Sequence, residues 1–445
     1  MRRIYFTLVS IIFITSVAYA QNVTRLSMQD CMDYALKHNY NIKNTQLDVL
    51  IQKAQIGQVL SAAYPHINGK VELDDYLNPQ QSIIDGKYFG LPAGTKEKIA
   101  FTLPYGGSAS VSGSQVIFDG GVFIAIKARN TLMDFARLNG AVTEENIRYN
   151  VYKAYNSLVI AYRQYDIIKS SLSYARSLEH DVIITRQNGF AEKIDVERTS
   201  VQVNNLATDS IRIGNLLTTS EQLLKYQIGM DINTPIVLTD TILETRKQTT
   251  VALLNEEEHY DRVPEYNLVT TALKLNEYNL KRYKYAAYPS LNAFGAMGYN
   301  YPTTYFNDLF FGPNYLFNSI VGLQLNVPIF NGFMRANQVT EAKLNVEKSK
   351  NSIENMKQTI DFQAATSRTT LKNAILQVQS QRRNMELAND VLDLAQKKYK
   401  AGVGSNLEVT QAQTDLLRAQ TNYFSAMLDV INAEADLKKA LGLLK

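Results

Sequence analysis

The sequence contains two copies of one pattern, and this duplication limits the folds open to the chain more than any other feature. Tyr64-Pro65 recurs as Tyr288-Pro289, 224 residues later. Three further markers recur in the same order at offsets of 212 or 213 residues: Phe118-Asp119-Gly120 with Phe330-Asn331-Gly332, Gly189 and Asp195 with Gly402 and Glu408, and Ile228-Gly229 with Leu441-Gly442. Because chance rarely produces four markers in one order, we interpret the chain as two tandem structural repeats.

Each repeat is expected to hold a leading helix, two strands, a very long helix and a return helix. The first repeat spans 21–230 and the second 255–445, with an inter-repeat element at 231–254. Proline ends each leading helix, alternating apolar residues predict the strands, and glycine separates the long helix from its return helix. The predicted ranges are leading helices 27–63 and 255–287, strands 66–76, 101–118, 290–302 and 318–330, loops 77–100 and 303–316, long helices 121–187 and 332–400, and return helices 192–228 and 405–442.

The last helix carries apolar residues in two rows that repeat every seven residues. Such an a/d seam predicts that the long helices pack along one another as in a coiled coil, and alanine in one row permits close approach. The rows indicate packing rather than chemistry. They consist of Ala412, Ala419, Ala426, Ala433 and Ala440, and of Leu416, Tyr423, Val430, Leu437 and Leu444.

Composition excludes several classes of protein. The mean hydropathy of the 445 residues is -0.19, and beyond the N-terminus no run of eighteen apolar residues could form a membrane-spanning helix. The single cysteine excludes an intrachain disulfide, and a net charge of +4 does not favour nucleic-acid binding. No P-loop, G-x-S-x-G, H-E-x-x-H or metal-ligand spacing occurs, so we expect neither an enzyme nor a cofactor.

Residues 1–20 have the pattern of a secretory signal peptide. Arg2 and Arg3 precede an apolar stretch at 4–14, and Ala18-Tyr19-Ala20 forms a small-x-small cleavage site. Cys31 does not directly follow the apolar stretch and is a poor lipid acceptor. We therefore expect a chain that is exported from the cytoplasm.

Four predicted strands are too few for a closed sheet. An open sheet has two edges that associate with other strands unless they are covered, and a single-chain membrane barrel needs at least about eight strands. Three copies of the chain would supply twelve strands, and their long helices would form a tube. Aromatic residues gather in the second hairpin, as they do in the interfacial girdles of membrane barrels: Tyr299, Tyr301, Tyr305, Phe306, Phe310, Phe311, Tyr315 and Phe317.

Several short motifs, each weak alone, together resemble the TolC-type outer-membrane efflux channels. They are the segment 26–36 with Asn39, the two Tyr-Pro pairs, Phe118-Asp119-Gly120-Gly121, Pro328-Ile329-Phe330-Asn331-Gly332, and Tyr399-Lys400-Ala401-Gly402 followed by Leu407-Glu408-Val409, Ala412-Gln413, Ala419-Gln420 and Tyr423. The resemblance covers essentially all of the mature chain. It implies a mainly α fold with a small membrane β part: a homotrimer with a twelve-stranded β-barrel in the outer-membrane lipid and an α-barrel reaching into the periplasm.

The same resemblance implies a function and partners. Channels of this type are passive exit ducts, gated at the periplasmic tip, and an adaptor (membrane fusion) protein in the periplasm joins them to an inner-membrane pump. Gly189 and Gly402 then correspond to the turns at the periplasmic tips, which contact the adaptor. Tight helix reversals often require positive φ, which gives glycine a backbone role there.

The resemblance also assigns a selectivity ring and a gate. Glu408 corresponds to a ring of carboxylates in the constricted tunnel, whereas Gln411 stands where a second acidic ring is expected, which predicts a weaker negative constriction. Tyr399 and Asp195 correspond to a gate-locking pair. Gly404 replaces a locking arginine, so other contacts are expected to hold the closed state.

Simpler interpretations compete with these roles. Glu408 and Asp195 each follow a turn, where an acid favours a helix N-terminus, and Tyr399 continues a seven-residue packing row. A conduit for type I protein secretion would have the same sequence features as an efflux duct. A secreted structural coiled-coil protein would explain the heptads but not the two proline-bounded hairpins.

Overall fold

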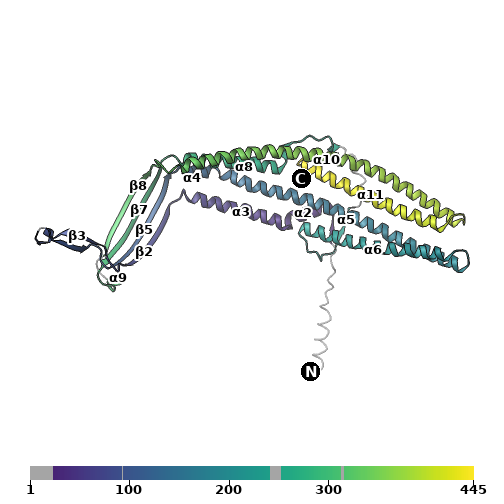
Figure 1. Ribbon diagram of the computed structural model, residues 1–445, viewed down its shortest axis with the longest axis horizontal. Helices are drawn as coiled ribbons and strands as arrows, with labels where there is room; N and C mark the ends of the chain where they lie inside the picture. Colours follow the sequence, from purple (N-terminus) through teal and green to yellow (C-terminus); the bar gives the residue numbers. More distant parts are fainter. Residues whose placement is uncertain (1–23, 93, 241–251, 312–314, 445) are drawn as a thin grey trace, which may run out of the picture. The chain divides into compact units, whose positions relative to one another are not determined.

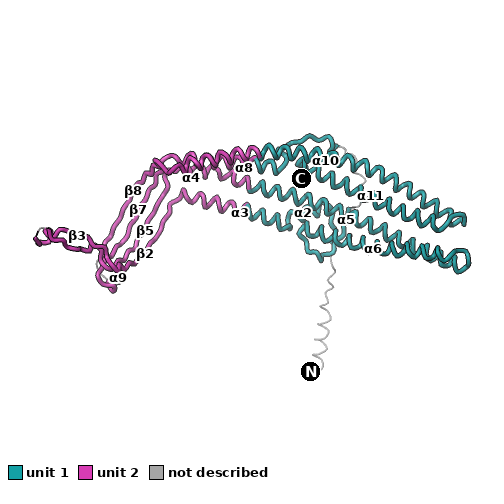
Figure 2. The backbone as a smooth tube through the Cα atoms, in the orientation of Figure 1, with its two compact units in different colours: residues 1–48, 136–269, 352–445 teal, residues 49–135, 270–351 magenta. Residues whose placement is uncertain are grey.

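The computed structural model describes residues 24–92, 94–240, 252–311 and 315–444 (Figure 1). The predicted signal peptide at 1–20 and residues 241–251 of the predicted inter-repeat element at 231–254 lie outside these residues. The chain forms two compact units (Figure 2): one is built from 1–48, 136–269 and 352–445, and the other from 49–135 and 270–351. Each unit contains parts of both repeats, so the units do not follow the repeat boundary.

The unit built from 49–135 and 270–351 holds an antiparallel sheet in the order β2-β5-β7-β8. The first repeat supplies β2 (His66–Asp75) and β5 (Tyr105–Phe118), and the second supplies β7 (Ser290–Thr303) and β8 (Leu316–Asn326). The two hairpins lie side by side because β5 pairs with β7, while β2 and β8 remain at the edges.

The sheet has one largely apolar face and one more polar face. Strand partners are odd with odd and even with even up to a register shift beside Phe118. Odd positions hold residues such as Val71, Val111 and Leu323, whereas even positions hold mainly serine, asparagine, glycine and charged residues. Period-two alternation therefore fixes which face each side chain occupies.

Two sequence predictions for this sheet are wrong in detail. The last strand was expected to reach residue 330, but β8 ends at Asn326, shortly before Pro328, whose missing N–H cannot join a ladder. The segment 77–100 was expected to be a loop, yet β3 (Gln81–Asp85) and β4 (Lys96–Ala100) pair as a hairpin around the short helix η1 (Gly86–Phe89). The loop expected between the first two strands of the four-stranded sheet therefore contains a two-stranded sheet of its own.

Helices α4 (Gly120–Lys127) and α9 (Asp308–Phe311) belong wholly to the sheet-bearing unit. Four helices contribute residues to both units: α3 (Tyr40–Ser61), α5 (Arg129–Gln187), α8 (Pro264–Tyr285) and α10 (Met334–Lys400). The remaining elements all lie in the unit built from 1–48, 136–269 and 352–445. They are the helices α2 (Met28–His38), α6 (Lys193–Ile228) and α11 (Asn406–Ala440), the parallel strands β1 (Thr24–Leu26) and β6 (Ile236–Leu238), and the short helix η3 (Tyr260–Arg262).

Three predicted helices are shorter or broken. The leading helix at 27–63 is divided at Asn39, whose extended backbone ends α2 and whose side-chain amide donates to the Gln227 carbonyl (2.7 Å). The long helix expected at 121–187 is interrupted at Ala128. In the second repeat, α8 begins at Pro264 rather than 255, because proline is well suited to the first helical position.

Most residues of the predicted heptad rows lie in the core of the other unit. Ala412, Ala426, Leu416 and Leu437 of α11 are all buried. One cluster joins α5, α10 and α11 through Leu178, Val182, Leu392, Ala395, Val409, Ala412 and Leu416. The mainly helical fold with a small β part is therefore as predicted. No helix among the described residues combines the length and apolar character needed to cross a bilayer.

Candidate functional site

The turns between the long and return helices have the same backbone structure in both repeats. Gly189 (φ 82°) donates its N–H to Arg186, and Phe190 donates to Thr185; Gly402 (φ 74°) donates to Tyr399, and Val403 to Lys398. These paired bonds form Schellman motifs, which satisfy carbonyls at a helix end and place the glycine in the left-handed region.

Each turn also presents an apolar side chain to solvent. Phe190 is 86% exposed and Val403 is 75% exposed, and each directly follows the turn glycine. Beside the turns, the first residues of α6 and α11 border a groove of about 470 Å³. Its lining includes the exposed side chains of Ile194, Val201 and Leu407. The tip thus has apolar surface from both repeats.

The two predicted acids each occupy the third position of a return helix. Asp195 accepts a hydrogen bond from the N–H of Glu192 (3.2 Å), so its carboxylate caps α6. Glu408 donates its N–H to the hydroxyl of Ser405 (3.2 Å), which caps α11. Asp195 therefore has a structural role in addition to any role in gating.

The Glu408 carboxylate faces back across the turn. Its Oε2 lies 3.4 Å from Nζ of Lys398, and both side chains are about half exposed. Gln411, one turn further along α11, donates its amide to both carboxylate oxygens of Asp415 (3.2 and 3.1 Å). Glu408, Gln411 and Asp415 are all exposed and, at spacings of three and four residues, share one helix face.

Tyr399 is half-buried against the core cluster that includes Leu392 and Val409. Burial raises the pKa of its hydroxyl, and the carboxylates of Asp181 and Asp195 raise that pKa further. The charges of the predicted Asp195 and of Asp181 on α5 thus both act on Tyr399. The hydroxyl is therefore protonated at neutral pH.

Gly404 is enclosed by the end of α10. Its N–H donates to the Lys398 carbonyl (3.1 Å), and a Cβ at this position would lie 2.9 Å from both the Lys398 Cβ and the Tyr399 nitrogen. A larger residue therefore does not fit this turn unless the backbone shifts. An arginine therefore does not fit at this position in the backbone conformation that the turn has here.

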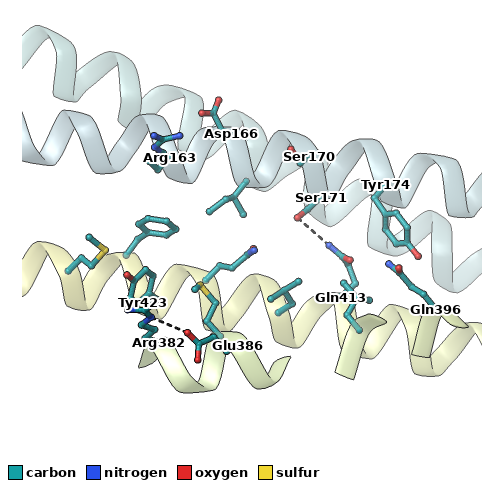
Figure 3. A pocket seen from close by; sticks show the side chains of 17 residues that line it. Arg163, Asp166, Ser170, Ser171, Tyr174, Arg382, Glu386, Gln396, Gln413 and Tyr423 are labelled. Atoms are coloured by element: carbon teal, nitrogen blue, oxygen red, sulfur yellow. Dashed lines mark hydrogen bonds and ion pairs between the residues drawn. The ribbon is translucent and has the colours of Figure 1, made fainter. Parts of the chain in front are cut away.

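Farther from the turns, α5, α10 and α11 line an open cavity of about 860 Å³ (Figure 3). Gln413 of α11 donates to the hydroxyl of Ser171 on α5 (3.3 Å), and Arg382 pairs with Glu386 along α10 (3.0 Å). Arg163 and Asp166 line the same cavity. Basic and acidic side chains are balanced here, so the cavity does not select one sign of charge. Among the described residues, no group of three or more metal-ligand side chains occurs.

Three charged residues at the tip were missed from the sequence. Lys398 precedes the predicted Tyr399, Asp415 follows Gln411 by one helical turn, and Asp181 lies on α5 two turns before Gly189. The i,i+4 spacing could have indicated Asp415. The approach of Lys398 to Glu408 depends on how the chain turns at Gly404, which spacing alone does not give.

Comparison with known proteins gives a family match over the second repeat. Residues 273–443 match the model of the outer membrane efflux protein family. The probable efflux pump outer membrane protein TtgC of Pseudomonas putida is 32% identical over 123 residues, covering 27% of this chain and 25% of that protein. The solvent efflux pump outer membrane protein SrpC of Pseudomonas putida is 34% identical over 120 residues, with the same coverage. The matched part is thus about a quarter of the length of these relatives.

Solved structures share the fold over almost the whole chain. The outer membrane protein VceC of Vibrio cholerae superposes with a TM-score of 0.72 at 14% identity, covering 93% of this chain and 96% of that one. The CmeC outer membrane channel of Campylobacter jejuni gives 0.73 at 17% identity, covering 93% and 85%. The resemblance to TolC-type channels is confirmed, and the matches agree with the transport class, rather than an enzyme, and with the outer-membrane location predicted from the sequence.

Proposed function

We propose that this chain, which has the fold of TolC-type outer-membrane channels and whose residues 273–443 match the outer membrane efflux protein family, is one of three identical subunits of an outer-membrane efflux channel. The observation that carries this proposal is the pairing of β5 with β7 inside one chain. It supplies a template for how the two open edge strands, β2 and β8, pair between chains.

The two hairpins have the same register. His66 pairs with Ser114 in the first repeat, and Ser290 pairs with Asn326 in the second. Ser290 follows His66 by 224 residues and Asn326 follows Ser114 by 212, which are the offsets of the duplicated markers. In position, β7 is therefore the counterpart of β2, and β8 is the counterpart of β5.

This equivalence predicts the pairing between subunits. Within the chain, Gly113 of β5 pairs with Gly295 of β7. The equivalent contact between chains joins Leu325 of one subunit to Val71 of the next. Both side chains are exposed in the single chain, at 64% and 77%, so the contact would cover apolar surface.

The predicted register also preserves the faces of the sheet. It pairs odd residues with odd residues, so Leu323 lies beside Leu73 and the apolar face continues across the junction. A slip by one residue would place Leu323 beside Glu72 or Asp74 instead. Repeating the junction three times closes a ring of twelve strands, whose apolar face suits lipid and whose polar face suits a water-filled interior.

Disulfide trapping tests this arrangement. A protein with Leu325→Cys and Val71→Cys is expected to form linked dimers and trimers in outer membranes, whereas each single variant is not. The matched control, Leu325→Cys with Glu72→Cys, is one residue out of register and should cross-link poorly. Efficient linking of the control but not of the predicted pair, or a monomeric protein, would overturn the proposed barrel.

The proposed activity is passive passage through this barrel and a helical tube, gated at the tip. The efflux names of the relatives favour export of small molecules over protein secretion. Phe190, Val403 and the adjoining apolar groove support contact with a periplasmic adaptor that links the tube to an inner-membrane pump. Purified protein in planar bilayers is expected to form pores, and a protein that never conducts would contradict the proposal.

For the gate, Glu408 and its counterparts in the other subunits would form the carboxylate ring. The Lys398–Glu408 pair occupies the turn where the related channels are expected to carry an arginine, and it supports the idea that Lys398 moderates the ring. Gln411 weakens the second ring, while Asp415 retains an acid on the same helix face. Tyr399 with Asp195 and Asp181 would hold the closed state.

A further inference from the structure

The carboxyl group of Glu145 is buried in the unit that contains 136–269 and 352–445. Glu145 lies on α5 and is 4% exposed. Its Oε2 has no hydrogen-bond partner within the described part of the chain. An ionised carboxylate in such a place loses its hydration without replacement, so the protonated form is favoured.

A second carboxyl group faces it. Glu265 is the second residue of α8 and is half-buried. Burial raises the pKa of Glu145 to about 8, and both the charge of Glu265 and a hydrogen bond with it act in the same direction. Two carboxyl groups at one site cannot both ionise without strong repulsion, which favours one shared proton.

The nearby cation does not remove this repulsion. Lys439 of α11 lowers the pKa of Glu145, but its effect is smaller than those that raise it. Its Nζ lies 2.6 Å from Oδ1 of Asn146 and 4.9 Å from the ring centroid of Tyr149. The ammonium group thus interacts with an amide oxygen and an aromatic face as well as with the charge of Glu145.

We propose that Glu145 and Glu265 share one proton and that this proton holds the start of α8 against α5. When the proton leaves for solvent, two carboxylates face each other and the start of α8 separates from α5. The proposed transport function does not depend on this shared proton, and the shared proton does not depend on transport.

The change is expected to be local. Just before α8, the Arg262–Val263 backbone packs against Gly442, and Glu258 forms an ion pair with Arg368 of α10. These contacts involve neither carboxyl of the pair. They keep the segment attached while the first turn of α8 opens.

The direction of the pH dependence follows from proton binding. The form in which α8 packs against α5 holds the shared proton up to a pH of about 8, whereas the form in which the start of α8 has separated releases it near pH 4.5, the ordinary pKa of glutamate. Between these two pH values the packed form therefore binds more protons than the separated form. The shared proton therefore stabilises the packed form fully below pH 4.5, the ordinary pKa of glutamate, and this stabilisation is lost as the pH rises through about 8. Between pH 7 and pH 9, the ratio of molecules with α8 packed against α5 to molecules with the start of α8 separated falls by about tenfold.

Hydrogen exchange of the backbone amides at 264–269 tests the proposal in the full-length assembled protein. After correction for intrinsic exchange, protection is expected to fall about tenfold from pH 7 to pH 9. Glu145→Gln keeps a neutral hydrogen-bonding side chain and should abolish this fall. Glu265→Gln should do the same and serves if Glu145→Gln assembles poorly.

Glu434→Gln is the matched control. Glu434 is equally buried, at 3% exposure, but Lys438 lies 2.6 Å away and neutralises it. This variant should keep the fall seen in the unchanged protein. Equal protection at pH 7 and pH 9 in the unchanged protein, or a fall that persists in both Glu145→Gln and Glu265→Gln, would overturn the proposal.

Discussion

Gly442 lies directly against the backbone of Arg262. A Cβ on Gly442 would come within 2.6 Å of both the carbonyl carbon and the carbonyl oxygen of Arg262, and the glycine has a φ of 66°. Gly229 makes the equivalent contact in the first repeat, where a Cβ would lie 2.9 Å from the backbone of His38 and Asn39. In both repeats, the end of the return helix packs against the backbone just before a helix, α3 in the first repeat and α8 in the second, with no room for a side chain.

Replacing either packed glycine by alanine is expected to destabilise the fold. The left-handed backbone conformation costs alanine about 1–2 kcal/mol of folding free energy. The backbone shift forced by the new Cβ costs about 1–3 kcal/mol more. Thermal unfolding of Gly442→Ala and Gly229→Ala should show clearly lower midpoints. Gly57→Ala in α3 is the control, because its Cβ meets nothing within 4 Å and alanine favours a helix interior.

The tip glycines should tolerate alanine better than the packed glycines. Gly189 and Gly402 share the positive φ, but a Cβ at either position meets nothing within 4 Å. Only the conformational cost of about 1–2 kcal/mol remains. Unfolding midpoints of Gly189→Ala and Gly402→Ala should therefore lie between those of the unchanged protein and Gly442→Ala. The reverse order would mean that the tip turns are packed in the assembly.

The order of the helices and strands can be predicted well from the sequence where a single proline or glycine ends a helix. Pro65 and Gly402 mark helix ends through backbone chemistry that does not depend on distant contacts. The hairpin of β3 and β4 was missed because its strands hold too few apolar residues for a period-two pattern: Ile83 and Ile84 are adjacent, and Ile99 stands nearly alone. Local patterns are too weak for such short strands.

The candidate site divides in the same way. Positive φ at Gly189 follows from its place between two helices. The approach of Lys398 to Glu408 could not be predicted, because the two residues are ten apart and meet only when Gly404 packs under the end of α10. Contacts made by a turn depend on the three-dimensional backbone, whereas the need for a turn is visible in the sequence.

Substitutions at Lys398 and Glu408 are expected to change ion selectivity in opposite directions. Glu408→Gln removes a carboxylate from the proposed ring and should reduce cation preference and block by trivalent cations. Lys398→Gln frees that carboxylate and should increase both. The exposed pair itself stabilises the fold by only about 0–1 kcal/mol, so the unfolding midpoint should hardly change.

Bilayer reversal potentials measured in a salt gradient give the selectivity. Glu354→Gln on α10 is a suitable control, since Glu354 also pairs with a lysine, Lys357, but lies far along the helix from the turn. If neither Glu408→Gln nor Lys398→Gln changes the reversal potential, these residues do not line the constriction.

Cys31 is expected to be unreactive in the folded protein. It is fully buried, and burial, helped by the carboxylates of Asp30 and Asp240, raises the pKa of its thiol to about 12. Because thiolate is the reactive form, maleimide labelling at pH 8 should be slow and should accelerate sharply when the protein unfolds. Rapid labelling of the native protein would contradict this, and would require Cys31→Ala in the disulfide-trapping experiment.

Conservative variants can separate gating from packing at Tyr399 and Asp195. Tyr399→Phe keeps the ring in its cluster but removes the hydroxyl, and Asp195→Asn keeps an acceptor for the Glu192 N–H but removes the charge. If these groups hold the closed state, each variant should raise the resting conductance of single channels at neutral pH. Their unfolding midpoints should stay close to that of the unchanged protein.

Asp195→Ala removes the helix cap as well as the charge. Loss of the hydrogen bond from the Glu192 N–H is expected to destabilise the protein by about 1 kcal/mol and to lower the unfolding midpoint. A purely structural role therefore predicts that Asp195→Ala lowers the midpoint while Tyr399→Phe and Asp195→Asn leave conductance at its resting value. A gating role predicts raised conductance in all three, so conductance of the two conservative variants decides between the roles.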